Sequence, residues 1–328
     1  MKNKKLLGNG LLLLMAFIWG TAFVAQRIGM DSIEPITFNA ARMVLAAIVV
    51  GLLSYILWLK EKNTAGKSVD EIAAKSADEV KEYNKNTIKG GILCGLFLSI
   101  ASISQQMGLV YTTAGKAGFI TAMYMLLVPI AGTIIFKKKN PLIVWLAVLL
   151  GIVGMYFLCI TEEFRLSKGD ALVLVCAFFF CGHILCIDHF VEKANPIRMA
   201  AIQFATAAVV SGIVAAFVEN PSIDALKAAA IPIAYCGLMS GGIGYTLQIV
   251  GQKYTEPAIA SLLMSMESVF AVVTGVILLH EAISFRETAG CVIMFAAIIL
   301  VQIPFLKSSK VLSEGNGENH EGKKDSEE

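Results

Sequence analysis

Apolar residues are gathered along this chain into long runs, and short polar segments separate the runs. Leu11 to Phe17 and Ile143 to Leu150 lie inside apolar stretches of about 20 residues, the length that an α-helix needs to cross the hydrocarbon core of a bilayer. Charged and Pro- or Asn-rich positions interrupt the runs. They predict ten helices, near residues 6–26, 36–59, 88–110, 115–136, 141–160, 169–190, 197–218, 228–250, 256–279 and 286–306. We therefore expect an all-α polytopic membrane protein.

Two segments depart from this pattern. Residues 60–86 alternate acidic and basic side chains and are expected to lie outside lipid. Residues 307–328 are rich in Gly, Glu, Asn and Lys, and so polar a segment is expected to form a disordered cytoplasmic tail. The basic start of the chain is read as the flank of an uncleaved first helix, because a cut near Ala25 would put bulky Phe23 where a signal peptide needs a small residue.

Composition agrees with a chain that lies in lipid. Hydrophobic residues make up 56% of the 328 residues, charged residues 16%, and mean hydropathy is +0.71, whereas soluble domains carry about a quarter charged residues. The net charge of +2 and the lack of interleaved basic and aromatic residues exclude a nucleic-acid partner. The seven cysteines form no C-x-x-C pair and fall in apolar stretches, so neither a disulfide framework nor a metal site nor any other cofactor is expected.

Lys and Arg are distributed unequally between the two sides of the predicted bundle. With the N-terminus inside, the inner side carries 20 of them and the outer side 6, while Arg42 lies within a helix. Cytoplasmic loops carry the excess of positive charge in membrane proteins. We therefore expect ten crossings of the cell membrane with both termini in the cytoplasm.

The sequence also contains an internal repeat. A shift of 143 residues superposes these identical pairs in one ungapped window: Gln105 on Gln248, Gly108 on Gly251, Tyr111 on Tyr254, Thr112 on Thr255, Ala117 on Ala260, Met123 on Met266, Gly132 on Gly275 and Ile134 on Ile277. Earlier in each half a shift of 161 is better, and it sets Pro35 on Pro196 and Ala40 on Ala201. The charged insertion at residues 60–86 accounts for the difference.

The repeat predicts two units of five helices each, over residues 6–160 and 169–306. Because five is odd, the second unit would enter the membrane from the opposite side, an inverted-topology repeat of the kind found in secondary transporters. Loop charges agree: Lys137-Lys138-Lys139 maps onto His280-Glu281-Ala282. The positive charge is lost where inversion would place the loop outside.

Several short fragments in this order resemble the EamA-type family of the drug/metabolite transporter superfamily. They are Trp19-Gly20-Thr21, Pro35 with Arg42, Gly108 to Thr113, Ala117 to Thr121, Ser265 to Phe270, Leu279 to Glu281 and Gly290. The chain departs from the usual pattern at Glu267-Ser268, where the family usually has Glu-Pro, and at Cys181-Gly182-His183, where a Trp-Gly or similar pair is more usual. The resemblance implies ten helices, a central cavity between the halves, and transport of metabolites such as amino acids, often outward.

Helices 115–136 and 256–279 each divide into a small polar face and a bulky apolar one at 100° per residue. The polar faces carry Thr121 with Tyr124 and Ser265 with Glu267. Small polar faces pack against other helices or line water in membrane proteins. We expect these faces to line the substrate cavity and the bulky faces, which include Val269, to meet lipid.

Glu267 is the foremost candidate for a substrate contact or a proton-coupling group, because an acid in the middle of a span is costly unless it has a function. A protonated carboxyl that only bonds a neighbouring helix is the alternative. Tyr124 is its equivalent at the shift of 143, so symmetry predicts that the two face each other.

Arg42 is the candidate for a carboxylate clamp, with Asn39 on the same helix face. The alternative is an arginine that snorkels to the membrane surface. Gln203, its equivalent at the shift of 161, is expected to line the opposite entrance.

His183 is a second candidate for proton coupling, and a neutral histidine in a packed interface is the alternative. The remaining candidates for substrate hydrogen bonds are Trp19, Gln26, Gln105, Gln106 and Gln248. Packing for the tryptophan and helix-to-helix hydrogen bonds for the glutamines are their alternatives.

These features favour a secondary transporter of a small-molecule substrate, since the sequence has no nucleotide-binding loop that would power a pump. An intramembrane enzyme is the first alternative, although no H-E-x-x-H, G-x-S-x-G or paired Asp motif is present. A passive channel or a scaffold without transport activity is the second. The oligomeric state is open, with a homodimer among the alternatives.

Overall fold

The computed structural model describes residues 2–64, 77–112, 114–159, 167–279 and 284–300, and the regular elements in them are all helices. The bounds are α1 Lys2–Met30, α2 Pro35–Thr64, α4 Ala77–Gly108, α5 Ala114–Ala122, α6 Tyr124–Phe136, α7 Leu142–Cys159, α8 Lys168–Phe190, α9 Pro196–Val218, α10 Ile223–Ala228, α11 Ala230–Tyr235, the π-helix η1 Cys236–Gly244, α12 Tyr245–Gln252, α13 Pro257–Met264 and α14 Glu267–Leu279. Residues 285–300 form a last helix. Residues 65–76 of the charged segment and the tail at 307–328 lie outside the described residues.

Eight helical stretches of the described chain are long and apolar enough to cross a membrane. They are Lys4–Met30, Pro35–Lys60, Asp78–Gly108, Ala117–Phe136, Lys168–Phe190, Pro196–Val218, Ala230–Gln252 and Pro257–Thr274. A shorter apolar helix, Leu142–Phe157, accompanies them. The chain is thus a multi-pass membrane protein, and two of the ten predicted crossings stay predictions.

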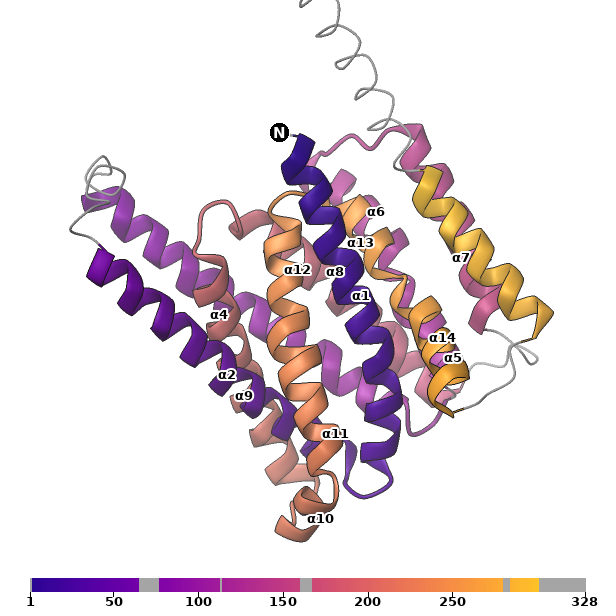
Figure 1. Ribbon diagram of the computed structural model, residues 1–328, viewed down its shortest axis with the longest axis horizontal. Helices are drawn as coiled ribbons and strands as arrows, with labels where there is room; N and C mark the ends of the chain where they lie inside the picture. Colours follow the sequence, from indigo (N-terminus) through magenta and orange to yellow (C-terminus); the bar gives the residue numbers. More distant parts are fainter. Residues whose placement is uncertain (1, 65–76, 113, 160–166, 280–283, 301–328) are drawn as a thin grey trace, which may run out of the picture.

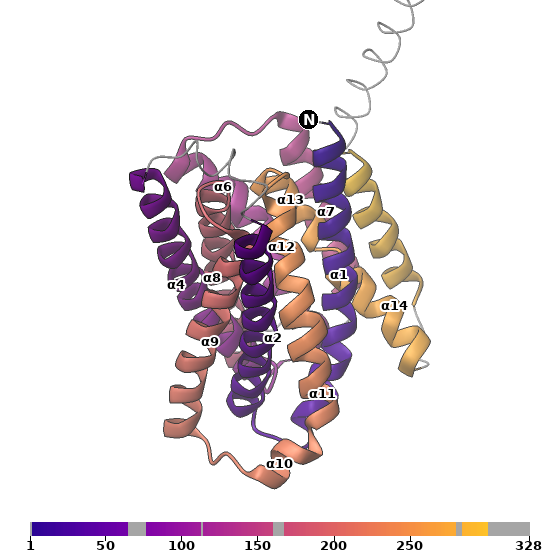
Figure 2. The same cartoon turned by 60° about the vertical axis from the view of Figure 1, so that its left-hand side comes forward.

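The helices form one bundle, with α2, α4 and α9 on one side and α7 with the helix at residues 285–300 on the other (Figure 1). α2 packs along α9, α4 packs along α8 and α9, and α1 packs along α14. The start of α1 and the end of the helix at residues 285–300 lie at the same end of the bundle (Figure 2). We call this the lysine-rich end, since the loop that holds Lys137, Lys138 and Lys139 also lies there. The opposite end, where α1 ends and α2 begins, is called the distal end.

Local sequence signals fix where several helices begin. Ser167 and Asp170 form a capping box at the start of α8, and each side chain satisfies a backbone N–H that has no partner inside the helix. Asn195 accepts a hydrogen bond from the backbone N–H of Arg198 at the start of α9. Proline occupies the first position of α9 and of α13, where its missing N–H costs nothing.

Both halves contain a helix that is broken at equivalent points. α5 and α6 meet at Met123, and α13 and α14 meet at Ser265 and Met266. The shift of 143 maps the start of α5 onto that of α13, both bounds of α6 onto those of α14, and the start of α7 at Leu142 onto the start of the helix at residues 285–300. The end of α5 differs from that of α13 by one residue. The helix bounds thus follow the predicted repeat, while the opposite orientation of the two halves stays a prediction.

The helices predicted at residues 115–136 and 256–279 are therefore present as spanning stretches, each with one break that the sequence did not predict. At each break the chain makes tight backbone bonds to the residue three positions earlier, from Met123 to Ile120 and from Met266 to Leu263. Hydropathy is insensitive to such a break, because the residues on both sides of it are apolar. The helix predicted at residues 228–250 is also interrupted, by the π-helical segment with its glycines.

The prediction that the bulky face of residues 256–279 meets lipid is wrong for its first half. Leu262, Leu263, Met266 and Val269 are all buried, because α1, α6 and α7 pack around this part of the helix. Val273 and Ile277, further along the same face, are exposed. Hydropathy cannot separate lipid from an apolar protein interior, since both favour the same side chains.

Candidate functional site

A narrow polar cavity of about 30 Å³ lies between the two halves of the bundle. Its lining residues come from both halves of the chain: Trp19, Phe23, Gln26, Arg42, Gln105, Thr121, Tyr124, Phe180, Ile184, Ser240, Tyr245, Gln248, Met264 and Glu267. The cavity thus combines one guanidinium, one carboxyl, three primary amides and several aromatic rings. Such a mixture is typical of a site for a small polar molecule.

Eight of the residues that the sequence suggested line this cavity: Trp19, Gln26, Arg42, Gln105, Thr121, Tyr124, Gln248 and Glu267. Asn39, Gln106, Gln203, Ser265 and His183 are buried outside its lining. Ser265 lies at the break between α13 and α14 and donates to the backbone oxygen of Leu262 at 2.7 Å. Gln106 has no partner for either amide atom. The structure thus brings most of the candidates together, and their roles stay predictions.

Tyr124 and Glu267 meet at the two helix breaks. The Tyr124 hydroxyl donates to Oε1 of Glu267 at 3.3 Å, as the symmetry of the repeat predicted. Each is the first residue of the second segment of its broken helix, α6 and α14. The start of a helix leaves backbone N–H groups without partners and favours negative charge, so the break in α13–α14 offers a partly compensated place for a carboxyl within the bundle.

Arg42 is held inside the bundle by a short chain of polar side chains. Its Nε and Nη2 donate to Oδ1 of Asn39 at 3.0 and 2.8 Å. Asn39 in turn donates to the hydroxyls of Ser102 and Ser211. Arg42 is only 8% exposed, so it does not snorkel to the membrane surface. It forms no ion pair with any residue that the structure describes, which leaves a buried positive charge available to an anionic group.

Aromatic rings form another part of the cavity wall. Trp19 donates from Nε1 to the backbone oxygen of Ser240 at 3.2 Å, and its ring lies 4.5 Å from that of Tyr245. Tyr245 lines the same cavity as Arg42 and Glu267.

Two glutamines of the cavity have unused hydrogen-bonding groups. Oε1 of Gln26 and both amide atoms of Gln248 have no partner in the protein, whereas Gln105 donates to the Thr121 hydroxyl at 3.2 Å. Buried polar atoms are nearly always paired, so these free groups indicate bound water or a ligand. Gln26 Oε1 and the Gln248 amide form no hydrogen bond to another helix, which was the alternative role expected for these glutamines.

His183 lies beside the cavity and not in its lining. Its Nε2 and Oε1 of Gln203 are 3.1 Å apart, and its ring contacts the rings of Phe180 and Tyr245. Nδ1 of His183 and Nε2 of Gln203 have no partner. The structure thus shows a packed histidine with one hydrogen bond, and a proton-coupling role for it stays a prediction.

Sequence reasoning missed Phe23, Phe180, Ile184, Ser240, Tyr245 and Met264, which also line the cavity. The repeat contains a signal for some of them, because Phe180 is the equivalent of Trp19 at the shift of 161 and Met264 that of Thr121 at the shift of 143. Tyr245 and Ser240 had no such signal. Among the described residues no group of three or more His, Cys, Asp or Glu side chains is placed to hold a metal ion.

Comparison with known proteins decides the family. The model of the EamA-like transporter family matches the chain twice, over residues 6–160 and 167–303. The chain belongs to this family. The resemblance seen in the sequence fragments is therefore confirmed, and the chain is a member of a family of membrane transporters.

Relatives of this EamA-like chain extend over almost its whole length. An uncharacterized transporter of Archaeoglobus fulgidus is 28% identical over 300 residues, which are 92% of this chain and 87% of the relative. The uncharacterized transporter YoaV of Bacillus subtilis is 21% identical over 298 residues, with 89% of this chain and 95% of the relative covered. A solved crystal structure shares the fold, with a TM-score of 0.70 at 15% identity over 92% of this chain and 98% of that chain.

Proposed function

We propose that this EamA-like chain is a secondary transporter that exports small metabolites with both a carboxylate and an ammonium group, such as amino acids. The observation that carries the proposal is the central cavity, which places an unpaired Arg42 guanidinium and the Glu267 carboxyl in one enclosed space. A zwitterion would satisfy both charges at once. The chain would cross the cell membrane ten times as two inverted halves, with the lysine-rich end in the cytoplasm.

Arg42 is the group that would hold the substrate carboxylate. Its planar fork offers five donors, and Asn39 occupies only Nε and Nη2. Charge-assisted hydrogen bonds are the strong ones in a low-dielectric site. Asn39 would also keep the guanidinium pointed into the cavity, because its own amide is fixed by two serines.

Glu267 is the group that would couple transport to proton movement. In alternating access a site near the middle of the membrane faces one side at a time. A carboxyl that takes up a proton on one side and releases it on the other would link proton flux to substrate flux. The hydrogen bond from Tyr124 supports this, because a tyrosine hydroxyl can donate to the charged carboxylate and accept from the protonated carboxyl.

The test is transport by the purified full-length chain in liposomes. Liposomes loaded with a mixture of radiolabelled amino acids should lose label faster than empty-membrane controls, and the rate should saturate with amino-acid concentration. An amino acid that competes would be identified by adding each unlabelled compound in turn. Leakage that never saturates would indicate a passive channel, and no flux of any amino acid would contradict the proposed substrate class.

A further inference from the structure

The lining of the central cavity is largely symmetric under the internal repeat. At the shifts of 161 and 143, ten of its lining residues form five equivalent pairs: Trp19 with Phe180, Phe23 with Ile184, Gln105 with Gln248, Thr121 with Met264, and Tyr124 with Glu267. Corresponding positions of the two halves thus face the same cavity. If each half took the conformation of the other, the same residues would still line this part of the cavity.

The remaining lining residues, Gln26, Arg42, Ser240 and Tyr245, break that symmetry. Their equivalents are Ile187, Gln203, Phe97 and Ser102, and none of these lines the cavity. Gln26 and Arg42 lie on the parts of α1 and α2 next to the distal end. The cavity therefore extends from its symmetric part toward the distal end, and the corresponding space toward the lysine-rich end is filled.

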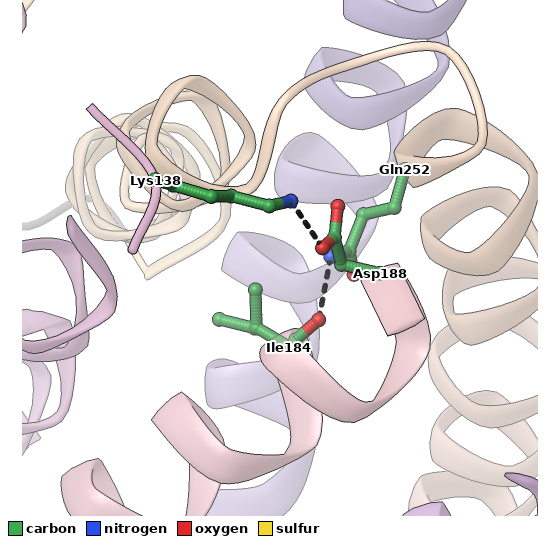
Figure 3. A network of polar contacts seen from close by, with 4 residues as sticks. All are labelled: Lys138, Ile184, Asp188 and Gln252. Carbon is green, nitrogen blue, oxygen red and sulfur yellow. Dashed lines mark hydrogen bonds and ion pairs between the residues drawn. The ribbon is translucent and has the colours of Figure 1, made fainter. Parts of the chain in front are cut away.

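Polar contacts close the bundle at the lysine-rich end, where α8 ends (Figure 3). Nζ of Lys138, in the loop after α6, lies 2.6 Å from Oδ2 of Asp188 on α8. One turn earlier on α8, the backbone oxygen of Ile184 accepts a hydrogen bond from Nε2 of Gln252, the last residue of α12, at 3.0 Å. These contacts join the end of α8 to both neighbouring elements, and Ile184 itself lines the cavity.

The residues equivalent to these differ at the distal end, and the equivalent of Lys138, Glu281, lies outside the described residues. Asp188 corresponds to Arg27 and Ile184 to Phe23 at the shift of 161, while Gln252 corresponds to Leu109 at the shift of 143. Arg27 is exposed and forms no ion pair with any described residue. Leu109 has no side-chain donor for a backbone oxygen. The halves also meet at the distal end, where Glu219 accepts hydrogen bonds from the backbone N–H groups of Ile36 and Thr37. None of these three residues lines the cavity, whereas Ile184 does.

We propose that the contacts of Lys138 with Asp188 and of Gln252 with Ile184 are a gate that closes the transport path at the lysine-rich end. The inference rests on the proposed function, since it takes the central cavity as the transport path. Lys138 and Asp188 keep side-chain exposures of 44% and 18%, and exposed ion pairs are weak, so the gate can break in every cycle. Its opening would expose Gln203 and His183, whose unpaired atoms Nε2 and Nδ1 would then meet water or substrate.

The gate is tested by the accessibility of position 203. The reporter is the full-length chain with its seven native cysteines replaced by alanine and with Gln203→Cys as the single thiol, in membrane vesicles whose lysine-rich face is exposed to a membrane-impermeant maleimide. Lys138→Asp replaces attraction to Asp188 by repulsion. It should raise the labelling rate about fivefold, the change in a two-state equilibrium that about 1 kcal/mol produces. The exchange Lys138→Asp with Asp188→Lys should return the rate to its starting value.

The matched control is Lys139→Asp, which makes the same change of charge in the same loop. Lys139 is exposed and forms no ion pair with a described residue, so this variant should leave the rate unchanged. If Gln203→Cys prevents insertion, His183→Cys replaces it as reporter. Unchanged labelling with Lys138→Asp, or an equal rise with Lys139→Asp, would overturn the gate. Labelling needs no substrate, so its result is independent of the amino-acid transport assay. The gate proposal can be supported when no amino acid is transported, and it can be refuted when transport is observed.

Discussion

Individual polar residues in the middle of this bundle are held by other polar residues from distant parts of the chain. Glu267 has the Tyr124 hydroxyl, and Arg42 has Asn39, which is fixed by Ser102 and Ser211. Such support keeps a charged group in one orientation in the low-dielectric interior of the bundle. Arg42 and Glu267 do not form an ion pair with each other, so a ligand with both charges could neutralise them.

Arg42→Gln should weaken substrate binding and leave insertion intact. The variant keeps a hydrogen-bond donor and loses the charge, and a hydrogen bond to a charged group contributes about 1.5–3 kcal/mol. We expect the half-saturation concentration for efflux from liposomes to rise about 10- to 100-fold. Arg198→Gln is the control, because Arg198 donates to Asn84 at 3.1 Å outside the cavity. Equal effects of the two variants would argue against a clamp at Arg42.

Glu267→Gln should abolish the acceleration of transport by a pH gradient. The amide has the size of the carboxyl and still hydrogen-bonds, but it cannot exchange a proton. Tyr124→Phe is the control, since it removes the hydrogen bond to Glu267 and keeps the carboxyl, and it should keep a response to the gradient. A full response in Glu267→Gln, measured in liposomes with an imposed pH difference, would refute coupling and leave a structural carboxyl or a pH-independent contact.

At the scale of elements, the broken helices α5–α6 and α13–α14 are what position the site. The first break puts Tyr124 at the start of α6, and the second puts Glu267 at the start of α14. α1 packs against α13 and α14, on both sides of the second break. A Cβ added at Gly20 would lie 2.6 Å from the backbone oxygen of Glu267 and 2.6 Å from Cβ of Phe270. The close approach of α1 to α14 therefore requires glycine at this position.

Gly20→Ala should destabilise the bundle and impair transport together. Overpacking of this kind costs about 1–3 kcal/mol, and the atoms that must move belong to Glu267. The apparent melting temperature in detergent should fall, and efflux with it. Gly10→Ala on the same helix is the control, because nothing lies within 4 Å of its Cβ position, and it should change neither quantity. A stable Gly20→Ala protein with normal efflux would show that α1 does not hold the break in place.

At the scale of the whole molecule, both described ends of the chain and the Lys138 loop lie at the same end of the bundle (Figures 1 and 2). The uneven distribution of Lys and Arg predicts that this end faces the cytoplasm. The charge distribution also predicts that Lys75 lies on the cytoplasmic side and Glu163 on the outer side, and both lie outside the described residues.

Labelling of single cysteines in intact cells tests this orientation. Asp224→Cys, in α10 at the distal end, should react with a membrane-impermeant maleimide added from outside, because its side chain is 94% exposed. Lys138→Cys should react only after the cells are opened. Reaction of the second variant in intact cells would reverse the orientation and turn the proposed export into import.

The sequence by itself determined the class of the molecule and its repeat. The sequence itself contains the apolar runs of spanning length, the unequal distribution of lysine between the two sides and the repeat at shifts of 143 and 161 residues. These are local or periodic patterns, so no coordinates are needed to detect them. The shift of 143 pairs Tyr124 with Glu267. The shift of 161 pairs Arg42 with Gln203, but it cannot show that only Arg42 lines the cavity in this structure.

Only the tertiary structure decided where the helices break, which apolar faces meet lipid and at which end the bundle is closed. Val269 and Leu262 are as apolar as a lipid-facing side chain and yet buried, because protein and lipid interiors favour the same residues. The ion pair of Lys138 with Asp188 and the hydrogen bond of Gln252 to Ile184 join segments far apart in the chain. Two similar halves can close at either end, so the end that is closed depends on how they pack and not on the pattern of either half.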